Sequence, residues 1–327
     1  MHDRLLPKRR KAPPLDPKGH PAAVFHNHGR YLRPYTNRGI AYFVILSRRL
    51  FHDSLKKGRF HKPDDLEIIL CHNYESKPIT ASSLDYLGLH DYVELGSDLQ
   101  PWLNYLKIPL VLDHLKRNCN AKYVLVLDAA DVILTADPVR MLECFRKEFD
   151  CGVLFNAAKD SFPGSSTQVA PIPLHLKQSG GRSKSDNFER VPESDIEKCI
   201  RVEIFEAETY DGPFCHLNAG CYIGRRKDVV DMLREAESLK FWFKTERYRI
   251  SDQGILREVH RRYFPRCQID SKCRIFQTLH NIERWELASE SPITHFEENL
   301  YRLGATVRAF LRRLRLRGQK LWEAWRN

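Results

Sequence analysis

Between residues 40 and 264 the chain alternates short apolar runs with longer stretches in which apolar residues recur at helical spacing. The runs have the length of buried strands, which are predicted at 40–47, 66–73, 91–95, 123–128 and 151–157. The longer stretches predict helices at 48–57, 101–118, 137–149 and 251–264, and a strand leading into a helix within 216–239. This alternation predicts a three-layer α/β sandwich with a mostly parallel sheet.

Composition divides the chain into one central domain and two tails. Residues 1–38 are basic, rich in Pro and expected to be irregular, and residues 39–300 are expected to form the domain. Within the domain, residues 159–210 are rich in Ser, Gly and Pro, which predicts a flexible insertion. Residues 301–327 predict a basic amphipathic helix, typical either of a peripheral membrane anchor or of a helix packed on the domain.

The net charge of +11 comes from the two ends of the chain. Residues 1–20 carry six basic and two acidic residues, and residues 301–327 carry eight basic residues and one acidic residue. Residues 21–300 are therefore neutral overall. A nucleic-acid-binding domain needs a basic track on its folded surface, so we expect no nucleic-acid partner. The basic residues of 301–327 instead suggest an anionic membrane surface as a partner.

Nine cysteines occur singly, without a CxxC pair. An odd number of scattered cysteines is typical of free thiols in a reducing compartment rather than of a disulfide framework. The N-terminus is basic but lacks the apolar region of a signal peptide, and no apolar run is long enough to span a membrane. These features predict a cytoplasmic protein, either soluble or bound peripherally to a membrane.

Two carboxylates follow the strand predicted at 123–128. The run from Tyr123 to Leu127 ends on Asp128, and Asp131 follows three positions later. Ligands of open α/β sheets bind at the carboxyl ends of strands, and two carboxylates there suit a hard divalent cation. The alternative is structural, with Asp128 capping the turn and Asp131 in solvent. The D-x-x-D spacing does not fit a haloacid dehalogenase phosphatase, which needs D-x-D.

Three blocks of sequence carry a resemblance to a known family. "YVLVLDAADVILTADPVRMLECF", "HLNAGCYIG" and "DSKCRIFQTL" occur in this order. They resemble the glycosyltransferase domain of the procollagen lysyl hydroxylase/glycosyltransferase enzymes and of the related procollagen galactosyltransferases. The resemblance covers about residues 40 to 300 and is weak in 159–210. It implies a GT-A fold, a UDP-sugar donor bound through manganese (Mn²⁺), and transfer of a hexose to an acceptor.

The resemblance also implies roles for individual residues. Asp128 and Asp131 match the family's metal and nucleotide ligands, and His295, after a short apolar approach, matches its third metal ligand. A Trp beside the uracil and a Lys near the diphosphate are physically reasonable. The residues expected to bind the donor are Trp102, Lys107, Asp128, Asn218 and Gly220.

Asp252, in "SDQ", matches the family's acceptor-side or sugar-binding carboxylate. In an inverting reaction it would be the general base, and in a retaining reaction it would position the sugar. The structural alternatives are a helix cap for Asp252 and a core position for Trp102. The sequence departs from the family at Ala130, where an aromatic residue is usual, and in the short acidic run before Gln253. Both departures leave the donor sugar and the acceptor open.

The sequence therefore predicts a Mn²⁺-assisted glycosyltransferase that moves a hexose from a UDP-sugar to a hydroxyl group. The acceptor would be a glycan, a lipid-linked glycan or a hydroxylysine-type protein. The alternative is a non-catalytic GT-A-like module that binds a nucleotide-sugar or a glycan at a membrane surface. Release of UDP in the presence of Mn²⁺ distinguishes the two.

Overall fold

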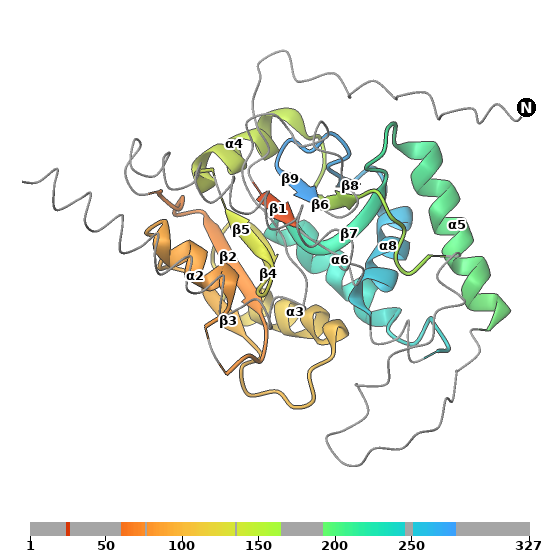
Figure 1. Ribbon diagram of the computed structural model, residues 1–327, viewed down its shortest axis with the longest axis horizontal. Coiled ribbons are helices and arrows are strands. Elements are labelled where there is room, and N and C mark those ends of the chain that lie inside the picture. Colours follow the sequence, from red (N-terminus) through yellow and green to blue (C-terminus); the bar gives the residue numbers. More distant parts are fainter. Residues whose placement is uncertain are drawn as a thin grey trace, which may run out of the picture.

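The computed structural model describes residues 24–26, 60–75, 77–134, 136–164, 192–245 and 251–278 (Figure 1). Its centre is a six-stranded sheet in the order β3-β2-β4-β7-β6-β8. The strands are β2 (Leu66–Cys71), β3 (Val93–Leu95), β4 (Tyr123–Asp128), β6 (Val153–Ala158), β7 (His216–Arg225) and β8 (Cys267–Ile269). β7 is antiparallel to both of its neighbours, and the other pairs are parallel. The predicted α/β class with a mostly parallel sheet is confirmed.

β2 and β4 are neighbouring parallel strands in the middle of the main sheet. They pair in parallel from Leu66↔Tyr123 to Cys71↔Asp128. The side chains from Tyr123 to Leu127 are buried, and the run is continuously apolar because structure covers both faces of the sheet. The register places the carboxyl ends of the two strands side by side.

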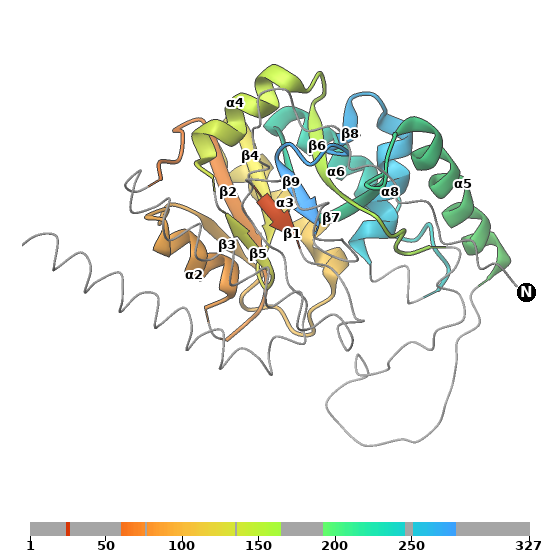
Figure 2. The ribbon, with the colours of Figure 1, turned by 45° about the horizontal axis from the view of Figure 1, so that its top comes forward.

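A second, three-stranded sheet has the order β5-β1-β9 (Figure 2). Its strands are β5 (Val132–Leu134), β1 (Val24–His26) and β9 (Phe276–Thr278). β1 is antiparallel to β5 and parallel to β9, and β9 contacts β6 of the main sheet. This small sheet joins residues from both ends of the described chain to the turn after β4.

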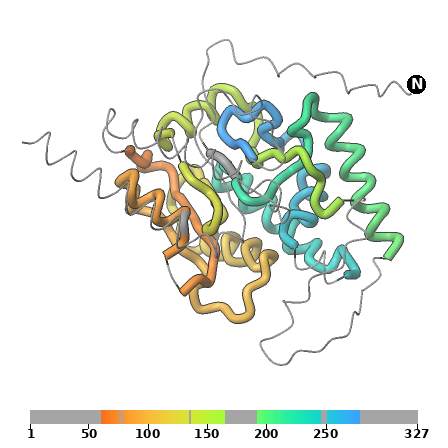
Figure 3. The backbone as a smooth tube through the Cα atoms, viewed as in Figure 1, coloured from red at the N-terminus to blue at the C-terminus, as the bar shows by residue number. Residues whose placement is uncertain are grey.

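Helices complete the layers. α3 (Lys107–Arg117), α6 (Arg226–Ser238) and α8 (Asp252–Tyr263) pack against the main sheet, and α6 lies in contact with both of the others. The remaining helical elements are α2 (Ile79–Tyr86), the 3-10 helix η1 (Asn104–Leu106), α4 (Pro138–Glu148) and α5 (Glu193–Thr209). α2 contacts β5 and α5 contacts α8, at opposite ends of the described part (Figure 3). The arrangement is compatible with the predicted three-layer sandwich.

Local sequence signals set several element boundaries. Asp137 caps α4 as predicted, because the Val139 amide donates a hydrogen bond to Asp137 Oδ1 at 2.9 Å. The helix predicted over 101–118 is shorter and begins at Lys107, after η1. Pro109 lies in its first turn, where a missing amide costs little. Ser251 precedes α8, but its side chain makes no capping hydrogen bond.

The segment predicted as an irregular insertion, 159–210, differs from the expectation in its last part. Residues Glu193–Thr209 form α5, whose buried positions include Asp195 and Glu206 as well as Cys199 and Val202. Carboxylates on the buried face interrupt the apolar periodicity by which the sequence would reveal a helix. Residues 165–191, the predicted strand at 40–47 and the predicted helix at 48–57 lie outside the described residues.

Within the described ranges, no helix combines the length and the apolar character that crossing a membrane requires. The amphipathic helix predicted at 301–327 lies outside these ranges. Its contact with an anionic membrane therefore stays a prediction.

Candidate functional site

Three charged side chains from distant parts of the sequence meet at the carboxyl edge of the main sheet. Asp128 ends β4, Lys107 begins α3, and Asp252 begins α8. Lys107 Nζ forms an ion pair with Asp128 Oδ1 and lies 3.4 Å from Asp252 Oδ2. The three side chains are 15%, 22% and 7% exposed, in the order Lys107, Asp128, Asp252. We call them the edge cluster.

The electrostatics of the edge cluster keep Lys107 charged. Burial opposes its charge, but the carboxylates of Asp128 and Asp252 hold the pKa of Lys107 above its usual value. Burial raises the pKa of Asp128, the Lys107 ammonium opposes this, and the Asp252 carboxylate adds to it. A cation at a helix N-terminus is unfavourable to the helix dipole, whereas an anion there is favourable. The carboxylates, and not the helix, therefore account for the position of Lys107.

Asp252 is the less compensated of the two carboxylates. Its Oδ1 accepts a hydrogen bond from the Gln253 amide at 3.0 Å, and its Oδ2 shares Lys107 with Asp128. Counting these three side chains alone, two negative charges share one positive charge.

The turn between the two carboxylates of the D-x-x-D is held by Thr80, at the start of α2. The Thr80 amide donates to the Ala129 carbonyl at 3.0 Å, and its hydroxyl donates to the Asp128 carbonyl at 2.7 Å. The same hydroxyl accepts from the Val132 amide at 3.2 Å. Asp131 is 8% exposed within this turn, so the expectation of a solvated Asp131 under the structural alternative is wrong.

Asn218 and Gly220 lie on β7, next to the edge cluster, because Leu127 pairs with Cys221. The Gly220 amide donates to Asn218 Oδ1 at 3.0 Å, so this oxygen is the acceptor, and Asn156 Nδ2 donates to it at 3.2 Å. Asn156 Nδ2 also donates to the Thr278 hydroxyl at 3.0 Å. Among the described residues, Asn218 Nδ2 and Asn156 Oδ1 have no hydrogen-bond partner although both side chains are buried. A hydroxyl group or a water molecule could satisfy both.

Gln253 connects α8 to the strand that carries Asn218. Its Oε1 accepts from the Ala219 amide at 3.1 Å, and its Nε2 donates to the Phe162 carbonyl at 2.7 Å. The first turn of α8, and with it Asp252, is thus tied to β7 and to the loop after β6. β6 and β7 also break register here, after Phe155↔Tyr222 and before Asn156↔Asn218, as strands often do beside functional sites.

Trp102 is half-buried against Gly96. A Cβ at Gly96 would lie 2.7 Å from Trp102 Cζ3, and Gly96 has φ +88°, so the close contact and the backbone both require glycine. The Trp102 indole N–H donates to Asn104 Oδ1 at 3.2 Å. The packing agrees with the core position that was one of the two alternatives for Trp102, and it leaves part of the ring exposed.

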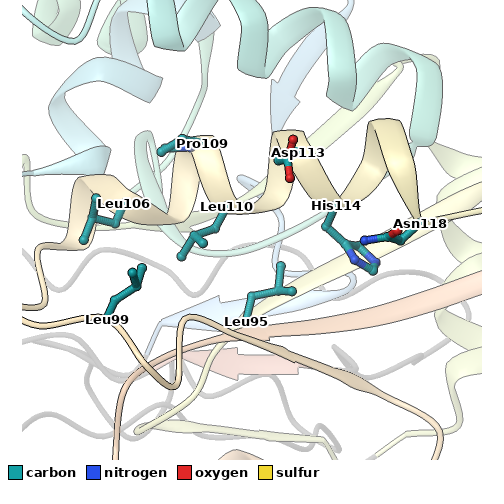
Figure 4. Close-up of a pocket in the computed structure, with 8 residues that line it drawn as sticks. All are labelled: Leu95, Leu99, Leu106, Pro109, Leu110, Asp113, His114 and Asn118. Atoms are coloured by element: carbon teal, nitrogen blue, oxygen red, sulfur yellow. The ribbon is translucent and has the colours of Figure 1, made fainter.

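A shallow apolar hollow of about 270 Å³ lies between β3 and α3 (Figure 4). It is lined by Leu95, Leu99, Leu106, Pro109, Leu110, Asp113, His114 and Asn118. None of these belongs to the edge cluster, although Leu106 and Lys107 are neighbours in sequence. The hollow therefore adds no catalytic group to the site.

The thiols near the edge cluster are poor nucleophiles. Burial raises the pKa of Cys71 to about 12, and burial also raises that of Cys221 well above its ordinary value. Both thiols remain protonated at neutral pH and cannot act as thiolates there. The chemistry at this edge is that of carboxylates and an ammonium group.

The structure brings together some of the predicted site residues. Asp128, Lys107 and Asp252 are in contact, and Asn218 and Gly220 lie on the neighbouring strand. His295, the predicted third metal ligand, lies outside the described residues. Within the described part, no group of three or more His, Cys, Asp or Glu side chains is arranged to hold a metal ion.

Sequence reasoning did not identify Thr80, Asn156 or Gln253 as parts of the site. Thr80 is hydrogen-bonded to Asp128, 48 positions later in the sequence, and Asn156 to Asn218, 62 positions later. Nothing in the sequence near Thr80 or Asn156 indicates these contacts. Gln253 directly follows Asp252, and that adjacency was the available signal. Compared with known families and with curated proteins, the chain matches no family model and no curated protein.

Proposed function

We propose that the chain is a metal-dependent glycosyltransferase of GT-A type that moves a hexose from a UDP-sugar to a hydroxyl group. The observation that carries the proposal is the edge cluster, in which Lys107, Asp128 and Asp252 meet at the carboxyl ends of the strands. Ligands of α/β sheets bind at this edge, and a nucleoside diphosphate needs positive charge next to it. The resemblance of the three sequence blocks to procollagen-modifying glycosyltransferases supports the same class.

The residues present fit a divalent cation in their chemistry. Asp128 is a partly exposed carboxylate that already binds a positive charge, that of Lys107, and carboxylate oxygens suit Mn²⁺. Asp128, Asp131 and, from outside the described residues, His295 would hold the ion. When bound, it would neutralise charge on the diphosphate and so make UDP a better leaving group.

The other residues of the site would bind and orient the substrates. Lys107 would leave Asp128 and contact the diphosphate. The flexible side chain of a lysine makes this movement possible. Asp252, fixed by Gln253, would accept a proton from the acceptor hydroxyl or position the sugar. Trp102 would lie beside the base through the exposed part of its ring, and the unpartnered amide nitrogen of Asn218 would meet a hydroxyl of the donor.

One observation favours a second function, a non-catalytic nucleotide-sugar or glycan-binding module. Lys107 bridges Asp128 and Asp252 directly, and both carboxylates must be released before they can take part in catalysis. A module that only binds would have no need to release them. Binding of UDP without turnover would support this function.

The test is release of UDP from a panel of UDP-hexoses by the full chain, with Mn²⁺ and with EDTA. We expect Mn²⁺-dependent release that EDTA abolishes. In Asp252→Asn, kcat should fall by about 10²–10⁴-fold while UDP binding remains, whereas the exposed control Asp113→Asn should match the unmodified chain. The absence of release from any UDP-hexose, with glycan and hydroxylysine peptide acceptors present, would contradict the proposal.

The place of action is part of the proposal. Residues 301–327, with eight basic residues and one acidic, would bring the enzyme to an anionic membrane, where each basic side chain contributes about 1 kcal/mol. Vesicle co-sedimentation of the full chain and of a form ending at residue 300, with anionic and neutral lipids, tests this. Equal sedimentation of the two forms would contradict it.

A further inference from the structure

One face of α5 presents apolar and acidic side chains to solvent. Its five residues are three or four positions apart, the spacing of one side of a helix, and they are Glu193, Glu197, Ile200, Ile204 and Glu208. Ile200 and Ile204 are 39% and 50% exposed, and the three glutamates are exposed as well. We call these five residues the acidic stripe.

The acidic stripe points away from the fold. Helical spacing places it opposite the buried positions of α5, which are Asp195, Cys199, Val202 and Glu206. Helix α5 is the outermost helix at its end of the described part (Figure 1 and Figure 2). Burying the two isoleucines of the stripe would be favourable, so the stripe can hold a further element whose charge suits three carboxylates.

The charge of the stripe favours a basic partner. Its glutamates carry three negative charges, and Arg201, the exposed basic residue beside them on α5, offsets one. Residues 301–327 carry eight basic residues and one acidic residue, and they are predicted to form an amphipathic helix. Such a helix would cover Ile200 and Ile204 with its apolar side and place basic side chains beside the glutamates.

The chain is long enough for this contact. The described part ends at Thr278 in β9, and residues 279–300 separate it from the basic segment. A linker of this length spans up to about 70 Å when extended, whereas a domain of this size is about 45 Å across. The linker also keeps the segment at a high local concentration, so that a weak contact suffices.

We propose that residues 301–327 dock on the acidic stripe of the same chain when no anionic membrane is present. The same basic side chains face glutamates in the docked state and anionic lipid in the membrane-bound state, so the two contacts compete. An anionic membrane then draws the segment away from α5. The docking does not rest on the proposed activity, whereas the competition rests on the membrane contact that is part of the proposed function.

The first test is amide hydrogen exchange of the full chain without lipid, followed in the peptides of residues 301–327 by mass spectrometry. We expect Ile200→Ser/Ile204→Ser to speed this exchange by about tenfold, because it removes the apolar part of the contact. The control Val139→Ser, at an exposed apolar position of α4, should exchange like the unmodified chain. Equal exchange in Ile200→Ser/Ile204→Ser and in the unmodified chain would overturn the proposal.

A charge exchange tests the electrostatic part of the contact. Glu197→Lys/Glu208→Lys reverses charge on the stripe, and Arg313→Glu/Arg317→Glu reverses it beside the apolar side of the predicted helix. Each pair should speed exchange by about tenfold, because like charges then face each other. A chain with all four substitutions should return to within about threefold of the unmodified rate. Exchange as fast in this chain as in the separate pairs would overturn the proposal.

Dilution distinguishes docking within one chain from docking on a second copy. A contact within the chain does not depend on protein concentration, so exchange of residues 301–327 should stay the same over about a tenfold dilution. Faster exchange on dilution would assign the contact to a second copy and overturn the proposal.

Binding to anionic vesicles tests the competition. Ile200→Ser/Ile204→Ser leaves the charge unchanged and should bind these vesicles about threefold or more tightly than the unmodified chain, because less of it is docked. Equal binding would overturn the competition. If neither chain bound, the proposed membrane contact would be contradicted, and the docking would still stand or fall with the exchange measured without lipid.

Discussion

The edge cluster lies at the end of β4, and a second group of charged side chains, Glu206, Arg257 and His216, is packed between α5, α8 and the start of β7. We call this second group the α5 cluster, and the two clusters are built in opposite ways. In the edge cluster two carboxylates, Asp128 and Asp252, share the ammonium of Lys107. In the α5 cluster one carboxylate, Glu206, is bound by two cations, Arg257 and His216. The edge cluster is held mainly by ion pairs at the carboxyl ends of the strands. The α5 cluster is held by several hydrogen bonds to Glu206 in the interior of the fold.

The difference separates a candidate site from a structural group. The four hydrogen bonds that reach Glu206 hold α5 and α8 to the start of β7, and against burial the Arg257 guanidinium lowers the pKa of Glu206 to about 2. At the edge cluster, burial and Asp252 raise the pKa of Asp128. A carboxylate whose pKa is lowered by its partners is typical of a structural ion pair. A carboxylate whose charged form is made less favourable by burial and by a second carboxylate is typical of a functional site.

The largest expected effect is that of Glu206→Gln. The change leaves Arg257 and His216 without their carboxylate in a buried position, and breaking a buried ion pair in this way costs about 3–5 kcal/mol. Urea unfolding should show this loss of stability. Glu208→Gln, at an exposed position of the same helix, is the matched control and should be neutral. A Glu206→Gln protein as stable as this control would mean that the α5 cluster is not structural.

The next effect is a pH dependence of stability that comes from His216. Its pKa in the folded protein, about 9, lies above the ordinary value of 6.5. The stabilisation is therefore fully present below pH 6.5 and is lost as the pH rises through about 9. Between about pH 6.5 and 8.5 the free energy of unfolding should fall by roughly 2–3 kcal/mol more in the unmodified chain than in His216→Gln. Parallel profiles for the two proteins would contradict a charged His216.

The smallest effect is expected in the edge cluster. Asp252→Asn removes one of two like charges and leaves Lys107 paired with Asp128, so the free energy of unfolding should stay within about 1 kcal/mol of the unmodified value. Urea unfolding, with Asp113→Asn as an exposed control, measures this. A loss of about 3 kcal/mol or more would place the edge cluster in the same structural class as the α5 cluster.

The parts of the fold that follow from local signals were predictable. The strand from Tyr123 to Asp128 is a continuous apolar run that ends on a charge, and α4 begins with the expected Asp137 cap and Pro138. α5 was not predicted, because Asp195 and Glu206 occupy its buried face. Asp195 accepts hydrogen bonds from the Lys244 and Thr245 amides, and Glu206 accepts one from Arg257. These partners lie about 50 positions away in sequence, and a local pattern cannot show them.

The site was predictable only in part, for the same reason. Asp128 at a strand end is a local signal, but its contact with Lys107 and the sharing of Lys107 with Asp252 depend on how α3 and α8 pack. The sequence blocks indicated these residues by resemblance, without their geometry. Thr80, which fixes the turn after Asp128 from 48 positions away, has no local signal at all.

The central claim is that the edge cluster binds a divalent cation in competition with Lys107. The direct measurement is Mn²⁺ binding to the full chain without nucleotide, by calorimetry or electron paramagnetic resonance. Asp128→Asn should weaken binding by about tenfold or more, and Lys107→Met should strengthen it by about tenfold, because the competing ammonium is gone. Lys116→Met, at an exposed lysine of the same helix, should bind like the unmodified chain. Unchanged binding in Asp128→Asn, or equal or weaker binding in Lys107→Met, would contradict the claim.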